Sequence, residues 1–144
     1  MPVAHRSSVV EDLRAALPGR VETDPERLLP YTTDRSGHRS AGTPIPAVHP
    51  RIVEEVQAVC RTATATGTPV VTRGAGTGPA GSAIAGPEEI VLCLGGMDQV
   101  LEVPEDNRLA VVQSGVLNVR IPRTTGGGEP VRRYGRRRLG SAPG

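Results

Sequence analysis

A glycine-rich run that directly follows a β-branched segment places the strongest constraint on this chain. The run extends from Arg73 to Ser82 with glycine at four of its ten positions, and Pro69-Val70-Val71-Thr72 leads into it. Glycine is favoured where φ must be positive or where the backbone must come close to a ligand. A strand that ends in such a run presents successive N–H groups, which suit an anion. We interpret the run as a phosphate cradle for a nucleotide-type cofactor, with an ordinary glycine-rich surface turn as the alternative.

The composition limits the core and excludes two kinds of chemistry. A length of 144 residues fits one domain, but the chain has no Phe or Trp, so its core must come from Val, Ile, Leu and Ala. All 17 basic residues are arginines. Without lysine, the chain cannot form a Walker-type phosphate loop or a lysine Schiff base.

The charge is divided unevenly along the chain. Residues 1–118 hold ten arginines and fourteen acidic residues, a net charge of −4, whereas residues 119–144 hold seven arginines and one glutamate, a net charge of +6. This Arg- and Gly-rich tail has no apolar periodicity, so we expect it to be disordered. Its arginines would allow salt-dependent association with nucleic acid. No folded nucleic-acid reader accompanies them, and a solvated tail without function is the better interpretation.

The other chemistry-bearing residues form no recognisable site. Cys60 and Cys93 are too few for a disulfide framework and show no metal-ligand spacing. Asp34, Ser36 and His38 offer the side chains of a catalytic triad, but a triad converges from separate elements, so a polar loop is the better interpretation. We therefore assign no catalytic residue and no metal ligand. No secretory signal or membrane-spanning run is visible, so we expect a cytoplasmic protein without membrane insertion.

Three helices are predicted. Residues 8–17 favour a short amphipathic helix, and Asp24-Pro25-Glu26 begins a second, briefer one. The longest runs from about Ile52 to Thr66 and ends at Gly67. The residues of this helix that helical spacing places on one apolar face are Ile52, Val56, Val59, Cys60 and Ala63.

The predicted strands are short. Residues 70–72 and the continuously apolar 89–94 lie on either side of the glycine run, and 100–103 and 109–113 form a hairpin around the loop 104–108. The alternating prolines of residues 44–50 limit that extended segment to an edge strand. Residues 76–81 match the Rossmann spacing G-x-G-x-x-G, but no helix follows before Gly86-Pro87, so the Rossmann interpretation fails.

The order of these signals is similar to that of a known family. The segments that carry the likeness are Tyr31-Thr32-Thr33-Asp34, Pro46 to Pro50, Glu54 to Val59, Pro69 to Gly78, Ile90-Val91-Leu92, Met97, Leu101-Glu102-Val103 and Leu109 to Val116. Together they resemble the N-terminal, PCMH-type FAD-binding domain of FAD-linked oxidases in the vanillyl-alcohol oxidase/p-cresol methylhydroxylase superfamily. Within it, the chain is most similar to the FAD-binding subunit of glycolate oxidase and to D-lactate dehydrogenases.

The resemblance implies an α+β fold, with short helices packed on a small mixed sheet, and FAD as the cofactor. It implies that backbone N–H groups of the glycine run face the diphosphate, that Thr77 adds a hydroxyl donor, and that Pro50 and Gly115 lie near the adenosine half. The cofactor-binding residues so implied are Pro50, Arg73, Gly74, Ala75, Gly76, Thr77, Gly78, Gly81, Ser82 and Gly115.

The chain departs from the family pattern. Pro79-Ala80-Gly81-Ser82 replaces Leu-Ser-Gly-Gly, and Pro79 removes one N–H donor. Arg51 replaces the usual Ser or Thr cap of the helix that follows. The likeness stops near Asn118, before the family's second FAD-contacting stretch and its substrate domain.

We therefore expect a truncated chain. Its parts would be an N-terminal helical segment at 1–24, a partial FAD-binding domain at 25–118 and the disordered tail at 119–144. We expect a FAD-binding fragment of a 2-hydroxy-acid oxidase or dehydrogenase, inactive alone, whose partners are the remainder of the flavoprotein or other oxidase subunits. Two alternatives stay open: a non-enzymatic module that complements a separate flavoprotein chain, and a fragment that associates with nucleic acid through its tail.

Overall fold

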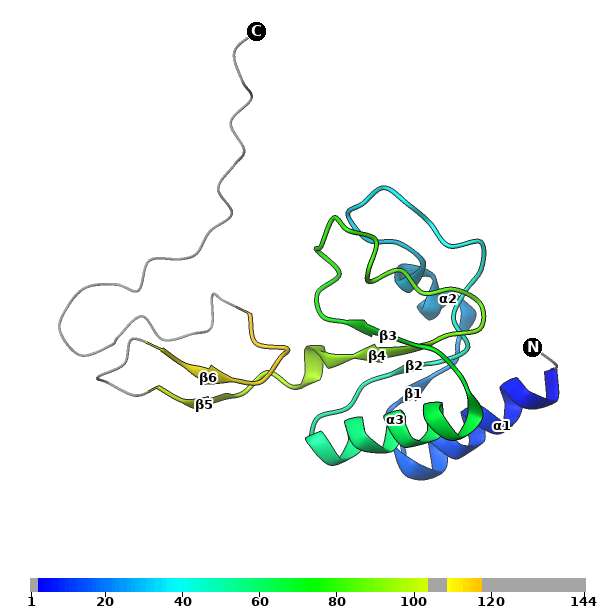
Figure 1. Ribbon diagram of the computed structural model, residues 1–144, viewed down its shortest axis with the longest axis horizontal. Coiled ribbons are helices and arrows are strands. Elements are labelled where there is room, and N and C mark those ends of the chain that lie inside the picture. The colour runs from blue at the N-terminus through cyan, green and yellow to red at the C-terminus, as the bar shows by residue number, and fades with distance from the viewer. Residues whose placement is uncertain (1–2, 104–108, 118–144) are drawn as a thin grey trace, which may run out of the picture.

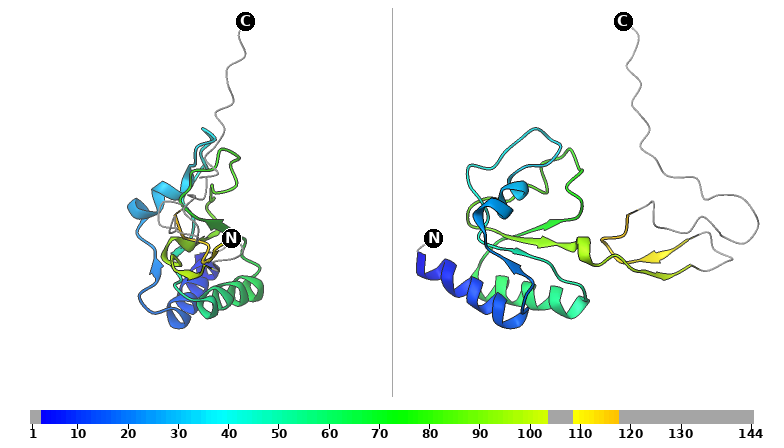
Figure 2. Two further views of the ribbon diagram at one scale, coloured as in Figure 1. Left: turned by 90° about the vertical axis from the view of Figure 1, so that its left-hand side faces the viewer. Right: turned by 180° about the vertical axis from the view of Figure 1, so that it is seen from behind.

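The computed structural model describes residues 3–103 and 109–117 and has the expected α+β fold. Its centre is a four-stranded mixed sheet in the order β1-β2-β4-β3. Helices α1 (Val3–Ala16) and α3 (Val53–Thr66) lie side by side on one face, and the short α2 (Pro25–Leu28) and two long loops cover the other (Figures 1 and 2). The strands are β1 Val21–Glu22, β2 Ala47–Val48, β3 Val70–Arg73 and β4 Ile90–Cys93.

Strand β4 is the centre of the core because its four residues are all buried. It pairs in parallel with both β2 and β3, and β1 adds antiparallel to β2. Alternate side chains of a strand point to opposite faces, so β4 supplies two separate apolar clusters. Toward the helices, Ile90 and Leu92 pack with Val9, Leu13, Leu17, Val48, Val59 and Ala63. Toward the loops, Val91 and Cys93 pack with Leu28, Ala47 and Ala85.

Helix α3 confirms the predicted range but not all of the predicted face. Gly67 ends α3 at φ 63°, and its N–H donates to the carbonyls of Ala63 and Thr64. Val59 and Ala63 are buried, whereas Cys60 and Ile52 are exposed. The predicted face is therefore too wide, because α3 meets the sheet and α1 along a narrow stripe. At the start of α3, where no side chain caps the helix, Glu55 Oε2 accepts a hydrogen bond from the Arg51 N–H at 2.6 Å.

The N-terminal helix begins earlier than the sequence predicts. It starts at Val3 rather than Ser8, and its buried residues follow helical spacing. Val9, Leu13 and Leu17 are at most 1% exposed and belong to the cluster beneath the sheet. Asp24 caps α2 as predicted, with its carboxylate accepting from the Glu26 N–H.

The prediction that residues 44–50 form at most an edge strand is wrong. Strand β2 lies inside the sheet, between β1 and β4. The proline-free positions supply the donors: Ile45 N–H donates to the Glu89 carbonyl at 3.0 Å and His49 N–H to the Arg20 carbonyl at 2.9 Å. Pro46 contributes its carbonyl, which accepts from the Val91 N–H at 2.9 Å. An internal strand of two residues tolerates neighbouring prolines because few donors are required of it.

Beyond the main sheet, a 3-10 turn η2 (Leu94–Gly96) leads into a two-stranded hairpin that extends away from the body (Figure 1). Its strands are β5 (Val100–Glu102) and β6 (Val111–Val112), as the sequence predicts. The predicted loop 104–108 and the predicted disordered tail 119–144 lie outside the described residues. None of the helices described is long and apolar enough to cross a membrane.

Candidate functional site

The carboxyl ends of the three parallel strands meet at one edge of the sheet. Strand β2 leads there into Pro50, β3 into the glycine loop (residues 74–82) and β4 into η2. In open sheets with parallel strands, ligands bind outside these carboxyl ends. The topology therefore brings together three segments that are far apart in the sequence.

The first half of the glycine loop carries free backbone donors. Within the described residues, the N–H groups of Gly74, Ala75, Gly76 and Gly78 donate no hydrogen bond. Gly76 has φ 66°, which requires glycine. A Cβ at Gly74 or Gly78 would meet no protein atom within 4 Å, and neither residue has a positive φ. Neither packing nor backbone conformation accounts for glycine at these two positions.

A cavity of about 330 Å³ opens between the start of the glycine loop and the end of the described chain. Its wall at the far side is fixed by Gly115, whose N–H donates to the Met97 carbonyl at 2.8 Å. A Cβ at Gly115 would lie 2.1 Å from the Leu94 carbonyl oxygen, so only glycine fits there. The residues that line the cavity are Gly74, Ala75, Gly95, Asp98, Ser114, Gly115, Val116 and Leu117.

The second half of the glycine loop is held by the loop of residues 31–40, which runs alongside it (Figures 1 and 2). Arg35 N–H donates to the Gly78 carbonyl at 3.2 Å, and Ala85 N–H donates to the Tyr31 carbonyl at 2.9 Å. Gly81 has φ 75°, and a Cβ there would lie 3.8 Å from Ser36 Oγ. This half is therefore braced against protein rather than left open.

Asp34, Ser36 and His38 serve this bracing loop and not a triad. Asp34 Oδ1 accepts from the Ser36 N–H at 2.7 Å, and Ser36 Oγ accepts from the His38 N–H at 3.2 Å. Hydrogen bonds from Ser36 hold the pKa of Asp34 below its usual value, and the nearby N–H groups of Ala83 and Gly81 act in the same direction. The other carboxylate oxygen, Oδ2, is buried and accepts no hydrogen bond.

Arg73, the last residue of β3, turns its side chain inward beneath the loop. Its Nη1 donates to the Thr33 carbonyl at 2.8 Å and to the Ala83 carbonyl at 2.7 Å. Its guanidinium lies 5.5 Å from the centre of the Tyr31 ring. Nη1 is thus committed to two backbone carbonyls.

Three ionisable groups below the loop, Tyr31, Cys93 and His49, are held neutral. Burial raises the pKa of Tyr31, with a hydrogen bond to Cys93 acting in the same direction. Burial also raises the pKa of the Cys93 thiol and lowers the pKa of His49, whose ring lies 6.4 Å from that of Tyr31. These groups pack the floor of the site and carry no charge near neutral pH. No group of His, Cys, Asp or Glu in the described part of the chain could hold a metal ion.

Apart from Arg73, the predicted site residues fall into three groups. Gly74, Ala75 and Gly115 line the cavity. Pro50 is buried nearby, with its carbonyl oxygen 3.2 Å from where a Cβ of Gly96 would lie. Gly76, Thr77, Gly78, Gly81 and Ser82 form the rest of the loop outside the cavity.

Sequence reasoning missed five residues of the cavity wall. They are Gly95, Asp98, Ser114, Val116 and Leu117. The Gly95-Gly96 pair at the end of a buried strand was a usable signal, since it parallels the glycine loop at the end of β3. Asp98 follows η2 directly, and Ser114, Val116 and Leu117 reach the cavity only because the chain folds back after the hairpin.

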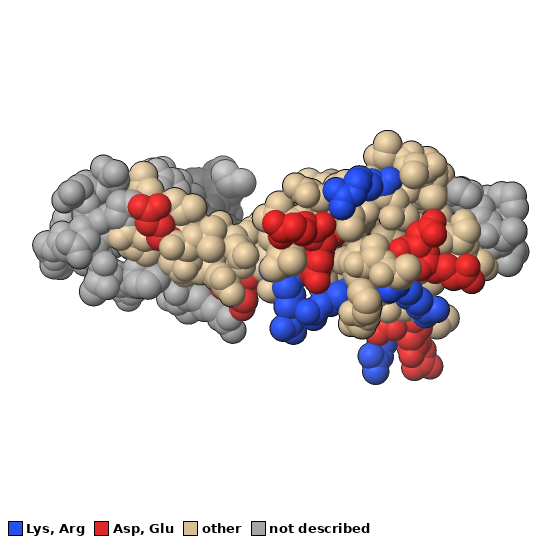
Figure 3. Space-filling view, turned by 90° about the horizontal axis from the view of Figure 1, so that it is seen from below, with Lys and Arg blue, Asp and Glu red and all other residues tan. Residues whose placement is uncertain are grey.

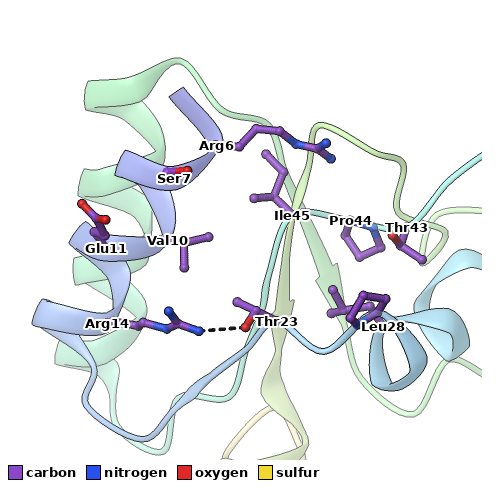
Figure 4. Close-up of a pocket in the computed structure, with 11 residues that line it drawn as sticks. Arg6, Ser7, Val10, Glu11, Arg14, Thr23, Leu28, Thr43, Pro44 and Ile45 are labelled. Atoms are coloured by element: carbon purple, nitrogen blue, oxygen red, sulfur yellow. Dashed lines mark hydrogen bonds between the residues drawn. The ribbon is translucent and has the colours of Figure 1, made fainter. Parts of the chain in front are cut away.

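A second hollow lies away from these strand ends, between α1 and the start of α2 (Figure 4). This groove has a volume of about 440 Å³, and Arg14 spans it to donate to Thr23 Oγ1 at 2.8 Å. Its floor includes Val10, Leu28 and Ile45. The face that carries α1 and α3 shows arginine and acidic side chains intermixed (Figure 3). Among the residues that the structure describes, that face shows no basic patch of the kind that nucleic acid requires.

Three comparisons place this geometry among known proteins. Residues 44–128 match the family model described as FAD binding domain. The D-2-hydroxyglutarate dehydrogenase of Stutzerimonas stutzeri (strain A1501) is 35% identical over 115 residues, which cover 79% of this chain and 25% of that protein. The glycolate oxidase subunit GlcD of Escherichia coli (strain K12) is 36% identical over 124 residues, 84% of this chain and 24% of that protein.

A solved structure agrees with the sequence relatives. The crystal structure of p-cresol methylhydroxylase with substrate bound superposes with a TM-score of 0.70 at 26% identity, covering 81% of this chain and 23% of that one. The chain thus spans about a quarter of the length of the proteins it matches.

Proposed function

This chain belongs to the family of FAD binding domains, homologous to glycolate oxidase subunit GlcD and D-2-hydroxyglutarate dehydrogenase, and from that premise we propose that its glycine loop holds the diphosphate of FAD. One observation carries the proposal. Four backbone N–H groups, at Gly74, Ala75, Gly76 and Gly78, are free of partners within the described residues, and they lie at the carboxyl end of a parallel strand. Successive amides of this kind form a concave binding site for an anion without needing lysine.

The residues present fit FAD at this position. Gly74 and Gly78 leave space that no protein atom fills, so a phosphate oxygen can approach the backbone. Thr77 and Ser82 are exposed and carry hydroxyl donors on the same loop. Pro79 offers no N–H, which limits the donor row to the first half of the loop and to residues 80–82.

The cavity beside the loop suits an uncharged part of the cofactor. Its volume of about 330 Å³ is at the lower end of the range for ligand pockets, so it holds part of a dinucleotide rather than all of it. Asp98 lines it, and a carboxylate accepts hydrogen bonds from hydroxyl groups but repels phosphates. We assign this cavity, with Gly115 and the nearby Pro50, to the adenosine half, and the glycine loop to the diphosphate.

Bound FAD supplies hydride acceptance, and this chain supplies binding. The described residues include no charged acid or base at the cavity apart from Asp98, and Tyr31 and His49 beneath the loop are neutral. In the proposal, oxidation of a 2-hydroxy acid by this flavoprotein type requires the part of the relatives' fold that this chain does not span. That part is either the remainder of the flavoprotein or a separate subunit. The chain alone therefore binds FAD without turning over substrate.

An alternative role is a non-enzymatic module that complements a separate flavoprotein chain. The hairpin favours it, since Leu101 and Val111 on β5 and β6 are 60% and 43% exposed. A two-stranded hairpin is marginally stable without further packing. Co-purification with a flavoprotein fragment would support this role. The other alternative, nucleic-acid association, depends on residues 119–144, which lie outside the described part.

The binding proposal is tested by calorimetry of the purified chain with FAD, ADP and riboflavin. FAD and ADP carry the diphosphate and are expected to bind, whereas riboflavin lacks it and is expected not to bind. Equal affinity for riboflavin and FAD would remove the glycine loop from the site. Absence of binding by all three would reject the proposal for the isolated chain.

The inactivity of the isolated chain needs a separate assay. Glycolate, D-lactate and D-2-hydroxyglutarate are each offered with FAD and a dye as electron acceptor. We expect no dye reduction above the rate without protein. Sustained turnover would show that this chain carries its own catalytic groups.

A further inference from the structure

We propose that the side chain of Arg73 is a positioning residue, which fixes the shape of the glycine loop and does not contact the phosphates. The inference rests on the proposed function in that the loop is taken as the diphosphate site. Arginine beside a phosphate loop would ordinarily be assigned to the phosphate, because its planar fork matches phosphate oxygens. The contacts of Arg73 point the other way.

The guanidinium closes the loop at its base. Arg73 is the residue before the loop and Ala83 the residue after it, and Nη1 bonds the Ala83 carbonyl at 2.7 Å. The same nitrogen bonds the Thr33 carbonyl at 2.8 Å, which ties both ends to the bracing loop of residues 31–40. A loop whose ends are tied has lost part of its conformational entropy before the ligand arrives, and that raises affinity without any contact to the ligand.

Two further protein groups lie against the guanidinium. The Tyr31 ring lies 5.5 Å from its central carbon, a distance at which a cation and an aromatic face attract. On another side, a Cβ at Gly76 would meet Nη2 at 2.3 Å and Cζ at 2.6 Å. Gly76 is therefore required twice, by its φ of 66° and by the arginine packed against it.

The arrangement depends on the planar shape of the arginine side chain. One planar group reaches two carbonyls and an aromatic ring at once. Lysine offers a compact point charge on a flexible stem and does not reproduce that planar geometry. Arg73 and Gly76 thus act as one unit, and the free N–H groups are held in place by it.

The test compares Arg73→Lys and Arg73→Gln with Arg61→Lys, an exposed arginine on α3, in the full 144-residue chain. Without ligand, the N–H groups of Arg35 and Ala85, which donate to the carbonyls of Gly78 and Tyr31, are expected to exchange about tenfold faster in both Arg73 variants and at an unchanged rate in Arg61→Lys. A tenfold change corresponds to about 1.4 kcal/mol of local opening. Unchanged exchange in the Arg73 variants would overturn the proposal. This arm stands whether or not the chain binds FAD.

The second arm separates positioning from direct contact. FAD affinity of wild type and of Arg73→Gln is measured from low to high salt. A residue that neutralises phosphate contributes to the salt dependence of binding, whereas one that shapes the loop does not. We expect about tenfold weaker binding with the same salt slope. A shallower slope in Arg73→Gln would show phosphate contact and overturn the proposal.

The third arm uses the contact with Gly76. Gly76→Ala and Arg73→Gln are expected to weaken FAD binding by similar factors, and the double variant is expected to be no weaker than the worse single one, because both break one unit. Multiplied losses in the double variant would contradict the proposal. Circular dichroism confirms in each case that the sheet and helices remain.

Discussion

The two faces of the central sheet are built by different means. The face toward α1 and α3 is an apolar interface in which Val9, Leu13 and Val59 are fully buried. The face toward the loops has a smaller apolar cluster and is held largely by backbone hydrogen bonds and by Arg73. Stability and binding therefore depend on different residues: burial beneath the sheet sets whether the chain folds, and the loop contacts above it set what it can bind.

The largest expected effect is on the helix face. Leu13→Ala removes a fully buried side chain and leaves a cavity, and we expect a loss of about 2–5 kcal/mol in the free energy of unfolding. Urea denaturation measures it. Leu29→Ala is the control, because Leu29 is 50% exposed and its truncation is expected to cost far less. Equal losses in the two variants would remove the distinction between the faces.

The next largest effect on stability is expected where Gly115 packs against η2. In Gly115→Ala, the new Cβ would overlap the Leu94 carbonyl oxygen at 2.1 Å, so the backbone must shift. We expect a loss of about 1–3 kcal/mol, together with loss of the cavity. Gly95→Ala is the matched control, since a Cβ there meets no protein atom within 4 Å. The stabilities of the two variants are compared by urea denaturation. Similar midpoints would show that Gly115 is not packed against the Leu94 carbonyl.

At the open glycines, Gly74 and Gly78, we expect a loss of FAD affinity without a change in stability. Gly74→Ala and Gly78→Ala place a methyl group where no protein atom lies, so unfolding free energies should change by less than about 0.5 kcal/mol. FAD affinity should fall about tenfold, equivalent to about 1.4 kcal/mol, because the methyl group displaces the ligand from the amides. Calorimetry and thermal melts report the two quantities. Thr64→Ala, exposed on α3, serves as the control. Unchanged affinity would move the ligand away from these residues.

The smallest effect is a pH dependence from the floor of the site. Burial lowers the pKa of His49, with Glu22 opposing it and the neutral Tyr31 ring beside it. The unfolded chain, with an ordinary histidine pKa of about 6.5, then binds more protons than the folded one. Stability is therefore complete above that pH and declines as the pH falls toward the folded pKa. His49→Gln should show a flatter profile between pH 7.5 and 5 in urea denaturation, whereas His38→Gln, in an exposed loop, should not. Identical profiles for wild type and His49→Gln would contradict this.

Much of the fold was predictable because it depends on local patterns. The apolar run of β4, the helical spacing of α3 with Gly67 at its end, and the Asp24 cap of α2 are each encoded within a few residues. The family, the α+β fold and FAD as the cofactor were also identified from the order of these segments, and the comparisons confirm them. The interior position of β2 could not be predicted from the sequence, because it depends on which neighbouring strands supply donors to the proline-rich segment.

The sequence by itself determined that a glycine loop follows a strand and that no lysine assists it. Only the tertiary structure decided which glycines face open space, at Gly74 and Gly78, and which are required by packing, at Gly76 and Gly115. It also decided that the Arg73 side chain donates to the Thr33 and Ala83 carbonyls. The physical reason is that backbone conformation follows from local residue types, whereas the partner of a long side chain depends on segments that meet only after folding.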